Sequence, residues 1–182
     1  LSVVDREGNL VALTQTLLSM FGCRVTLPGT GILLNNSMVS FDPRPGRPNS
    51  IAPGRRPLSN MCPAIVERGD GLRFAVGSSG GRRIMPAVLQ YVSFLADFGM
   101  TVDEAVHQPR IDSSGGPTVT MDTRLDAAVK ARLGEGRETL ESVSGVYPSV
   151  FSSPNIAAHD PARGLNAAGA WVYSPVAAVG VE

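Results

Sequence analysis

The sequence predicts an α+β domain in which helices cover β-sheets, and three observations lead to this prediction. Stretches rich in β-branched and apolar residues flank short turn sequences at 1–17 and 62–79, which is the pattern of β-hairpins. Residues 84–95 place apolar side chains at helical spacing. The predicted order is hairpin, strand, hairpin, two helices, strand, helix and further strands, which is typical of layered α+β domains.

The first third of the chain is predicted to hold one hairpin, one strand and a long loop. Residues 1–5 and 10–17 are β-rich, and the turn sequence "REGN" separates them. "GILLNN" at 31–36 is typical of a short buried strand. Residues 43–57 contain five prolines, two glycines and four arginines, so they predict a loop. This loop is either a solvated basic segment or a segment packed beside a site for an acidic ligand.

A second hairpin and two helices are predicted in the middle of the chain. The stretch "CPAIVERGDGLRFAVGSS" at 62–79 predicts two strands that turn at "RGDG". The next helix ends where Gly99 supplies a left-handed residue. Its apolar face consists of Ile84, Val88, Val92 and Leu95. "TVDE" at 101–104 is a capping box, which opens a short helix that ends before Pro109.

The last third is predicted to return to β structure around one more helix. "PTVTMD" at 117–122 is a strand pattern, and "RLDAAVKARLGEG" at 124–136 is a helix closed by glycine. Residues 143–182 alternate β-like runs with glycine, proline and serine breaks. No repeat or linker interrupts the chain, so we expect 1–182 to form a single structural unit.

Composition excludes several function classes. The 182 residues are 43% apolar, enough for a sizeable core, and their formal net charge is zero. A neutral chain does not favour nucleic acid or an anionic membrane as a partner. No apolar stretch reaches the length of a membrane-spanning helix. Cys23 and Cys62 lie in no metal-binding pattern, so we expect two buried small apolar residues, with a disulfide as the alternative.

The chain begins without methionine, and its first residue already belongs to a strand-like run, "LSVVDREGNLVALTQ". A start of this kind is typical of a processed or truncated product.

One motif, "GSSGG" at 77–81, stands between a predicted strand and a predicted helix. It fits the nucleophile elbow G-x-S-x-G, which would make Ser79 a nucleophile with His159 as base. The required acid would be one of Asp103, Asp112, Asp122 and Asp126. Against this interpretation, the sheet upstream is short and no HGGG-like oxyanion loop is present. We expect His159 to be a surface residue in a turn and His107 to cap helix carbonyls.

The same motif has a second interpretation, which uses the backbone. Gly80 and Gly81 would present N–H groups at the start of a helix, where anions bind. In acyl transfer, that anion is the tetrahedral oxyanion. A third interpretation is that the glycines only permit a tight turn.

At this point the sequence resembles the small, C-terminal subunit of gamma-glutamyltransferases, which belong to the N-terminal-nucleophile hydrolases. The resemblance follows the family's order and covers roughly residues 1–111. The matching stretches are "SVVDREGNLVALTQTL", "FG" at 21–22, "GILLNN", "RPLSNMCPAIV", "VGSSGGRRI" and "DEAVHQPRI". Beyond residue 111 the match is one of outline only.

The resemblance implies a four-layer αββα sandwich that a large N-terminal subunit of the same precursor completes. It implies that the precursor cuts itself before a threonine, whose hydroxyl attacks a small-molecule amide while its own amine acts as base. The family's Thr-x-His segment would lie immediately upstream of Leu1, with the threonine three positions before it. No metal or other cofactor is needed for this chemistry.

The resemblance also assigns roles to residues of this chain. Gly80 and Gly81 match the oxyanion glycines, and Thr16 matches a threonine that hydrogen-bonds the nucleophile. Ser59 matches the first of two serines that bind the substrate α-carboxylate, and Asn60 replaces the second while remaining able to donate a hydrogen bond. Further candidate substrate-binding residues are Asn36, Ser37 and Ser40.

Three positions depart from the family's pattern. The family holds the substrate α-ammonium with Asn, Gln or Glu, and Asp, where this chain has Leu18, Ser37 and Ser40. A desolvated ammonium without acceptors is unfavourable, although a loop shift could bring Asp42 into this role. We therefore expect acyl donors without the α-amine, such as glutaryl amides, which cephalosporin acylases of the family use.

Two other functions remain as alternatives. The chain could belong to a catalytically silent family member that acts as a binding protein, or Ser79 could be the nucleophile of a different hydrolase. Bacterial members of the family that the sequence resembles are often exported. A periplasmic or secreted location is therefore expected, with a cytoplasmic location as the alternative.

Overall fold

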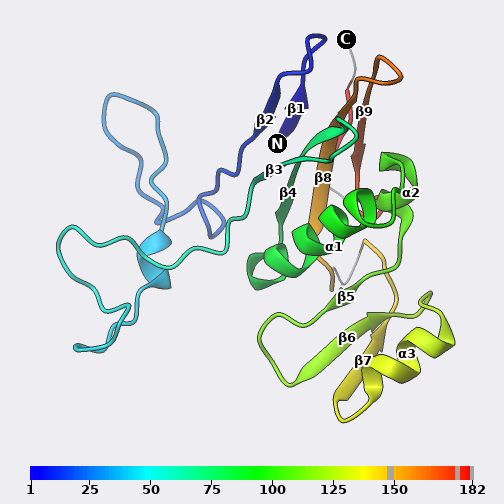
Figure 1. The fold of residues 1–182 in the computed structure, drawn as a ribbon. Coiled ribbons are helices and arrows are strands. Elements are labelled where there is room, and N and C mark those ends of the chain that lie inside the picture. Colours follow the sequence, from blue (N-terminus) through cyan, green and yellow to red (C-terminus); the bar gives the residue numbers. More distant parts are fainter. Residues whose placement is uncertain (147–149, 175–176, 181–182) are drawn as a thin grey trace. The chain divides into compact units, whose positions relative to one another are not determined.

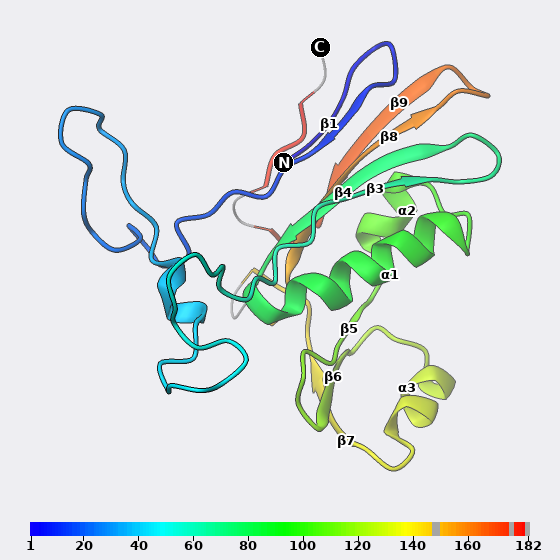
Figure 2. The ribbon, with the colours of Figure 1, turned by 60° about the vertical axis from the view of Figure 1, so that its left-hand side comes forward.

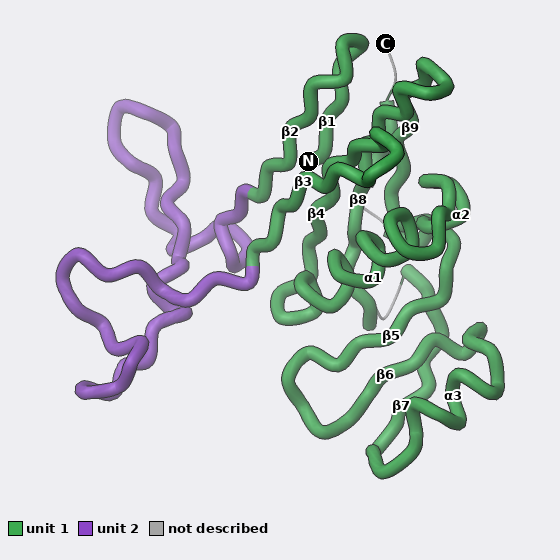
Figure 3. The backbone as a smooth tube through the Cα atoms, viewed as in Figure 1, with its two compact units in different colours: residues 1–14, 61–182 green, residues 15–60 purple. Residues whose placement is uncertain are grey.

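The computed structural model describes residues 1–146, 150–174 and 177–180. The chain divides into two compact units, shown in Figure 3. Unit 1 consists of Leu1–Thr14 and Met61–Glu182, and unit 2 consists of Gln15–Asn60. The expectation of a single structural unit over 1–182 stays a prediction.

Unit 1 is built on a four-stranded antiparallel sheet in the order β3-β4-β8-β9, visible in Figure 1. Its strands are β3 (Ala64–Glu67), β4 (Arg73–Ser79), β8 (Ser153–Asp160) and β9 (Leu165–Ala170). β3 and β4 form the predicted hairpin, which turns at residues 68–71. β4 also pairs with β8, in a register that joins Gly77 to Asn155 and Ser79 to Ser153. One of the two central strands, β4, therefore ends within the "GSSGG" motif.

Two helices, α1 (Ile84–Ala96) and α2 (Val102–His107), cover one face of this sheet, as Figure 2 shows. Alternate residues of β4 and β8 face them, because successive side chains of a strand point to opposite faces. The resulting core buries Phe74, Val76, Tyr91, Leu95 and Ile156 to 2% exposure or less. The capping box predicted at Thr101 and Glu104 is present and opens α2. Both predicted helices are confirmed.

A hairpin of β1 (Ser2–Val4) and β2 (Leu10–Ala12) packs on the opposite face of the sheet. Gly77 of β4 lacks a side chain where Thr14 approaches; a Cβ at Gly77 would lie 3.8 Å from the Thr14 Oγ1. Helices, sheet and hairpin are three layers of the expected αββα sandwich. In the described residues the second sheet consists of these two strands alone.

A smaller sheet in unit 1 has the order β5-β6-β7. It contains β5 (Ile111–Asp112), β6 (Thr118–Asp122) and β7 (Glu138–Ser142). β6 and β7 are parallel, and α3 (Ala127–Gly134) connects them. β6 and α3 were predicted from sequence, although α3 is shorter than expected because Asp126 caps its N-terminus.

Unit 2 has little regular structure. Its described residues form one 3₁₀-helix, η1 (Ser37–Ser40), and two isolated bridges, one of them from Thr26 to Leu33. The predicted buried strand at 31–36 is therefore wrong, because Leu33 forms one isolated bridge with Thr26 and the side chains of Ile32 and Leu34 are exposed. The predicted loop at 43–57 is confirmed, since it contains no helix or strand.

Several other expectations need correction. The second strand of the first hairpin ends at Ala12 rather than at residue 17. β5 and β7 were not expected at all. Cys23 is exposed, because unit 2 buries few side chains, whereas Cys62 is half-buried against the core of unit 1. Both cysteines are free.

The tail predicted to be β-like at 143–182 contains β8 and β9, while positions 147–149, 175–176 and 181–182 lie outside the described residues. Among the helices described, none is both long enough and apolar enough to cross a membrane.

Candidate active site

The turn from β4 into α1 has an unusual backbone. Gly80 has φ 141° and Gly81 has φ 64°, and both values lie in the region that favours glycine. A short 3₁₀-helix, η2 (Gly81–Arg83), then leads into α1. Neither glycine N–H donates a hydrogen bond to a described residue. Both residues are exposed, so two backbone donors are available to a ligand at this turn.

Gly80 is also closely packed. A Cβ at this position would lie 2.5 Å from the Cβ and 2.8 Å from the Cα of Ser152. Ser152 immediately precedes β8 and is buried, with 3% exposure. Any larger residue at position 80 would therefore collide with the adjoining strand.

Ser79 does not form a Ser–His pair with His159. The strand register pairs Ser79 with Ser153 but pairs His159 with Arg73 at the other end of β4. Residues 73 and 79 are separated by about 20 Å along an extended strand. The sheet is antiparallel around β4, unlike the parallel sheet that carries a nucleophile elbow.

The two histidines have structural partners. His159 lies within β8, half-buried, with Nδ1 2.7 Å from Asn166 Oδ1, so its predicted place in a surface turn is wrong. The alanine-rich residues around it pair with β4 and β9, and this pairing overrides their turn-like sequence. His107 Nδ1 lies 2.7 Å from the Asp103 carbonyl oxygen, so its predicted capping role is confirmed.

A cavity of about 930 Å³ adjoins the glycine turn in unit 1. Residues of β1, β8 and β9 line it together with Ser79. Leu1, at the beginning of the chain, and Asn155 of β8 are among these lining residues. The Asn155 Oδ1 is buried and has no hydrogen-bond partner among the described residues. The start of β1 and the end of β4 therefore face the same space.

The other candidate residues lie in unit 2. Thr16 Oγ1 accepts a hydrogen bond of 2.9 Å from the Leu18 N–H. Asn36 reaches the same turn, where its Oδ1 accepts from the Ser19 N–H at 3.0 Å and its Nδ2 donates to the Ser19 Oγ at 2.7 Å. The structure thus brings Thr16, Leu18 and Asn36 together.

Ser37 and Ser40 are the first and last residues of η1, and both are half-buried. Asp42 follows, but its carboxylate accepts two hydrogen bonds from the Arg44 guanidinium, at 2.8 and 2.9 Å. These bonds lower the pKa of Asp42 below its usual value. Asp42 therefore already has a cationic partner, so the role considered for it as an ammonium ligand is not supported.

Ser59 and Asn60 lie on an irregular segment at the end of unit 2; Ser59 is exposed and Asn60 is half-buried. The candidates therefore divide between the units. Unit 1 holds Gly80 and Gly81, and unit 2 holds Thr16, Asn36, Ser37, Ser40, Ser59 and Asn60.

A buried arginine close to the glycine turn was not singled out from sequence. Arg110 is 2% exposed, and its Nη2 donates to the Ser152 carbonyl oxygen at 2.8 Å. Its guanidinium lies 4.8 Å from the ring centre of Trp171 and 5.4 Å from that of Tyr91. Burial lowers the pKa of Arg110. The sequence signal was confined to its place in "HQPRI", which does not reveal its partner.

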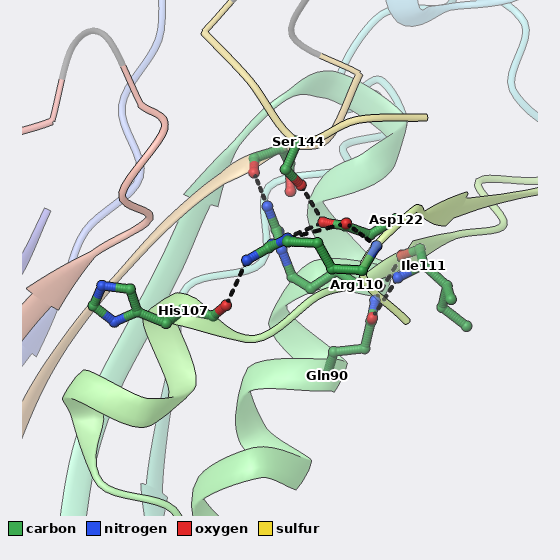
Figure 4. Close-up of polar contacts among 8 residues, drawn as sticks. Gln90, His107, Arg110, Ile111, Asp122 and Ser144 are labelled. Carbon is green, nitrogen blue, oxygen red and sulfur yellow. Dashed lines mark hydrogen bonds and ion pairs between the residues drawn. The ribbon is translucent and has the colours of Figure 1, made fainter. Parts of the chain in front are cut away.

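Beside Arg110 lies a second polar group, shown in Figure 4. The fully buried Asp122 carboxylate accepts hydrogen bonds from Arg124 and from the Ser144 hydroxyl. Burial raises the pKa of Asp122, but these bonds outweigh it and hold the pKa below its usual value. The Arg124 Nη1 also donates to the His107 carbonyl oxygen at 3.0 Å.

No cluster of His, Cys, Asp and Glu suited to a metal ion occurs among the described residues. What the arrangement offers instead is a pair of backbone donors beside a cavity. Donors of this kind stabilise an oxyanion when they are held in place.

Comparison with known proteins identifies relatives. An acylase proenzyme of Pseudomonas sp. (strain SE83) is 37% identical over 170 residues, covering 93% of this chain and 30% of the relative. The glutathione hydrolase proenzyme of Escherichia coli (strain K12) is 43% identical over 119 residues, covering 60% of this chain and 20% of the relative. This chain thus spans less than a third of the length of these proteins.

Solved structures agree with the sequence comparison. The T380A mutant of Helicobacter pylori gamma-glutamyltranspeptidase superposes with a TM-score of 0.76 at 31% identity, covering 96% of this chain and 97% of that chain. A cephalosporin acylase from Bacillus halodurans shares the fold, with a TM-score of 0.76 at 23% identity over 95% of this chain and 32% of that chain. Residues 1–170 match the family described as Gamma-glutamyltranspeptidase. The chain therefore belongs to the gamma-glutamyltranspeptidase family.

Proposed function

We propose that this chain forms the oxyanion-binding part of an N-terminal-threonine amide hydrolase or acyltransferase. The observation that carries the proposal is the pair of N–H groups at Gly80 and Gly81, which have no partner among the described residues. They lie at the end of β4, where Ser79 and Leu1 line one cavity. An oxyanion hole needs backbone donors of this kind beside the nucleophile.

In the proposed reaction, the threonine hydroxyl attacks the amide carbonyl and its α-amine accepts the proton. The carbonyl oxygen becomes an oxyanion that accepts hydrogen bonds from Gly80 and Gly81. Collapse of the intermediate expels the amine, which takes up the proton, and leaves an ester on the threonine. Water or an acceptor amine then attacks the ester and releases the acid or a new amide.

The direction of β1 supports a nucleophile just upstream of Leu1. Ser2 Oγ donates to the carbonyl of Asn155, which pairs with Gly77, whereas Asp5 accepts from Asn166 near the other end of the sheet. Extending β1 upstream therefore leads toward the Ser79 end of β4. A threonine three positions before Leu1 would be four residues beyond Ser2, or about 13 Å. Gly81 is likewise four residues beyond Gly77.

The β1–β2 hairpin supports a partner segment from the same precursor. Its outward face consists of two cross-strand pairs, Leu1 with Leu13 and Val3 with Val11. All four side chains are at least 41% exposed. An apolar face of this kind is typical of a surface that another segment covers. In the proposed enzyme the large N-terminal subunit covers it and supplies the fourth layer.

We further propose that the preferred acyl donor lacks an α-amine. Leu18 offers no acceptor side chain, Ser37 and Ser40 offer only hydroxyls, and Asp42 is bound to Arg44. The desolvated ammonium of a γ-glutamyl donor would find no carboxylate on this part of unit 2. A glutaryl amide has no α-ammonium group, so it leaves no such charge unpaired. The name of the acylase relative is in line with this preference.

The test uses the full-length precursor, freshly expressed. Intact mass and N-terminal sequencing should find a new threonine N-terminus three residues upstream of Leu1. The processed protein should hydrolyse glutaryl anilide with a kcat/KM about tenfold or more above that for γ-glutamyl anilide, because one unpaired charge is worth about 1.4 kcal/mol or more.

The outcomes separate the parts of the proposal. Equal turnover of the two anilides would refute the altered acyl preference but keep the reaction. An uncleaved chain without activity would refute the reaction and favour a silent binding protein. An uncleaved chain that still hydrolyses an anilide would instead favour the Ser79 hydrolase alternative, and Ser79→Ala in the same precursor should then abolish the activity.

A further inference from the structure

The glycine turn is held from one side by a residue that takes no part in the proposed chemistry. Ser152 packs against Gly80 so closely that no Cβ fits between them. Its own hydroxyl is buried and has no hydrogen-bond partner among the described residues. Ser152 therefore acts on the turn through its backbone and its Cβ. A contact that fixes the backbone of Ser152 therefore also fixes the atoms against which Gly80 packs.

Arg110 fixes that backbone. Its Nη2 donates to the Ser152 carbonyl oxygen at 2.8 Å across 42 residues of sequence. The guanidinium lies among the rings of Tyr91, Phe151 and Trp171, with ring centres 4.8 to 5.7 Å away. Cation–π contacts favour a desolvated guanidinium at such distances. Among the described residues, Arg110 forms no ion pair with a carboxylate, so its hydrogen bond to Ser152 is its direct polar link to the turn.

The backbone of Arg110 is itself fixed on both sides. Its carbonyl oxygen accepts from the Asp122 N–H at 3.0 Å. The next residue, Ile111, exchanges two hydrogen bonds with the Gln90 side chain on α1, at 2.8 and 2.9 Å. Figure 4 shows Gln90, Ile111 and Asp122 around Arg110. Arg110 is therefore bonded to Ser152, which packs against the glycine turn, and its neighbour Ile111 is bonded to α1, which follows that turn.

We propose that Arg110 is a positioning residue that holds Ser152 and thereby keeps the N–H groups of Gly80 and Gly81 aimed at the reacting carbonyl. This inference rests on the proposed function. Positioning of this kind matters for catalysis because a displacement of about 1 Å can lower a rate about 100-fold. Lysine would not replace arginine fully, since its point charge lacks the planar fork that stacks on rings and donates in a fixed direction.

The experiment compares three variants of the full-length precursor, Arg110→Met, Arg110→Lys and Arg68→Met. Arg68 is the matched control, because its Nη1 also donates to a carbonyl oxygen in unit 1, that of Leu95, at 2.7 Å. That bond lies at the far end of α1 from the glycines. Each variant is checked for processing by intact mass and for folding by thermal denaturation.

Two functional readouts follow. One is kcat and KM for glutaryl anilide. The other is the inhibition constant of 4-boronobutanoic acid, which forms a tetrahedral adduct with a hydroxyl nucleophile, set against that of glutarate, which forms none. A displaced oxyanion hole weakens binding of the tetrahedral boronate adduct, whereas binding of glutarate, with its planar carboxylates, changes little.

We expect Arg110→Met to lower kcat and boronate affinity about 10- to 100-fold, with KM and glutarate affinity within about threefold. Arg110→Lys should fall between this variant and the wild type. Arg68→Met should leave all four constants unchanged even if it melts at a lower temperature.

The proposal is overturned if Arg110→Met folds and is processed but keeps kcat and boronate affinity within about twofold of Arg68→Met. If both Arg110 variants fail to fold, Ser152→Gly decides, because it removes the Cβ that packs against Gly80 and leaves Arg110 intact. A wild-type kcat in Ser152→Gly would then refute the proposal. A wild-type precursor that neither turns over the anilide nor binds the boronate refutes the proposed function itself.

Discussion

In unit 1, the seven residues of β4 pair in register with β8, and the sheet they belong to is packed on both faces. In unit 2, η1 is the one helix described, and the chain is held by hydrogen bonds between loop residues, such as those of Asn36 with Ser19. Phe41 is the one large apolar side chain of unit 2 that is buried among the described residues. Unit 1 is therefore held together by strand pairing and core packing, and unit 2 mainly by hydrogen bonds.

Backbone strain follows the same division. Leu18, Phe21 and Arg24 have positive φ values between 61° and 73°, and they are the non-glycine residues with this conformation in the described chain. All three lie in unit 2. A left-handed conformation costs a non-glycine residue about 1–2 kcal/mol. In unit 1 the positive φ values fall on glycines, such as Gly80 and Gly81, which adopt them without this cost.

This difference between the units predicts which of them determines the reaction rate and which determines the substrate preference. The proposed oxyanion donors are on the sheet-to-helix turn of unit 1, and the residues proposed to contact the acyl group are in unit 2. Substitutions in unit 1 should therefore change rate or stability, whereas substitutions in unit 2 should change substrate preference.

The largest effect is expected for Gly80→Ala. Its Cβ would meet Ser152 at 2.5 Å, and alanine disfavours φ 141°, so the turn must move and displace both donors. We expect kcat for glutaryl anilide to fall about 100-fold or more, the loss measured when an oxyanion donor is removed.

The matched control for this variant is Gly115→Ala. Gly115 also has positive φ, 89°, but a Cβ there would meet nothing within 4 Å. It should lose some stability and keep its kcat. Equal kcat values for Gly80→Ala and Gly115→Ala would show that the glycine turn of unit 1 does not set the rate.

A second large effect is expected for stability when Asp122 is changed to Asn. Asp122 is fully buried and accepts hydrogen bonds from Ser144 and from Arg124, whose side chain is 39% exposed, so losing the carboxylate should cost about 1–3 kcal/mol. Since the folded-state pKa of Asp122 is lowered, its contribution is present above about pH 5 and declines as the pH falls through the folded-state pKa. Urea unfolding at pH 7 and pH 3 should therefore show a smaller difference between wild type and variant at pH 3.

Asp70→Asn is the control for burial. Asp70 pairs with Arg68 at 2.5 Å, and hydrogen bonds from Arg68 lower its pKa to about 2, but the pair lies at the surface. Exposed pairs contribute little to stability. A loss for Asp70→Asn as large as that for Asp122→Asn would contradict the importance of burial in unit 1.

The smallest effect is expected in unit 2, for Leu18→Asn. Asparagine tolerates the left-handed conformation of residue 18 better than leucine and adds an acceptor for an ammonium group. We expect a gain in stability of about 1 kcal/mol and a severalfold shift of kcat/KM toward γ-glutamyl anilide. Thermal denaturation and paired kinetics with the two anilides measure these changes.

Leu18→Gly separates the two effects, because glycine relieves the backbone strain without adding an acceptor. It should leave the preference between the anilides unchanged. The same shift in both variants would mean that strain at residue 18, and not the missing amide, sets the preference.

Sequence patterns predicted unit 1 well where periodicity is local. The helical spacing from Ile84 to Leu95 and the capping box at Thr101 both led to helices that the structure contains. β9, "LNAAGA", has no strand pattern of its own and is a strand because β8 pairs with it. "GILLNN" has an apolar pattern, but Ile32 and Leu34 are exposed in unit 2, which provides no core to receive them.

The site divides in the same way. Gly80 and Gly81 could be found because they are adjacent and precede a helix. The link from Arg110 to Ser152 could not be found, because these residues are 42 positions apart and no sequence pattern joins a buried guanidinium to one carbonyl oxygen. The pairing of Asp42 with Arg44 could be suspected from proximity, but the choice of this arginine over its loop neighbours depends on geometry.

The pairing of β4 with β8 has a consequence for how the protein folds. Residues 73–79 pair with residues 153–159. The two central strands of the sheet therefore cannot pair until most of the chain has been synthesised. Contacts between segments so distant in sequence are slow to form, because a long loop must be closed first. During that delay, β4 has β3 alone as a neighbour in this sheet and exposes a free edge. The glycine turn at its end thus acquires its shape late, only after the segment around Ser152 has docked.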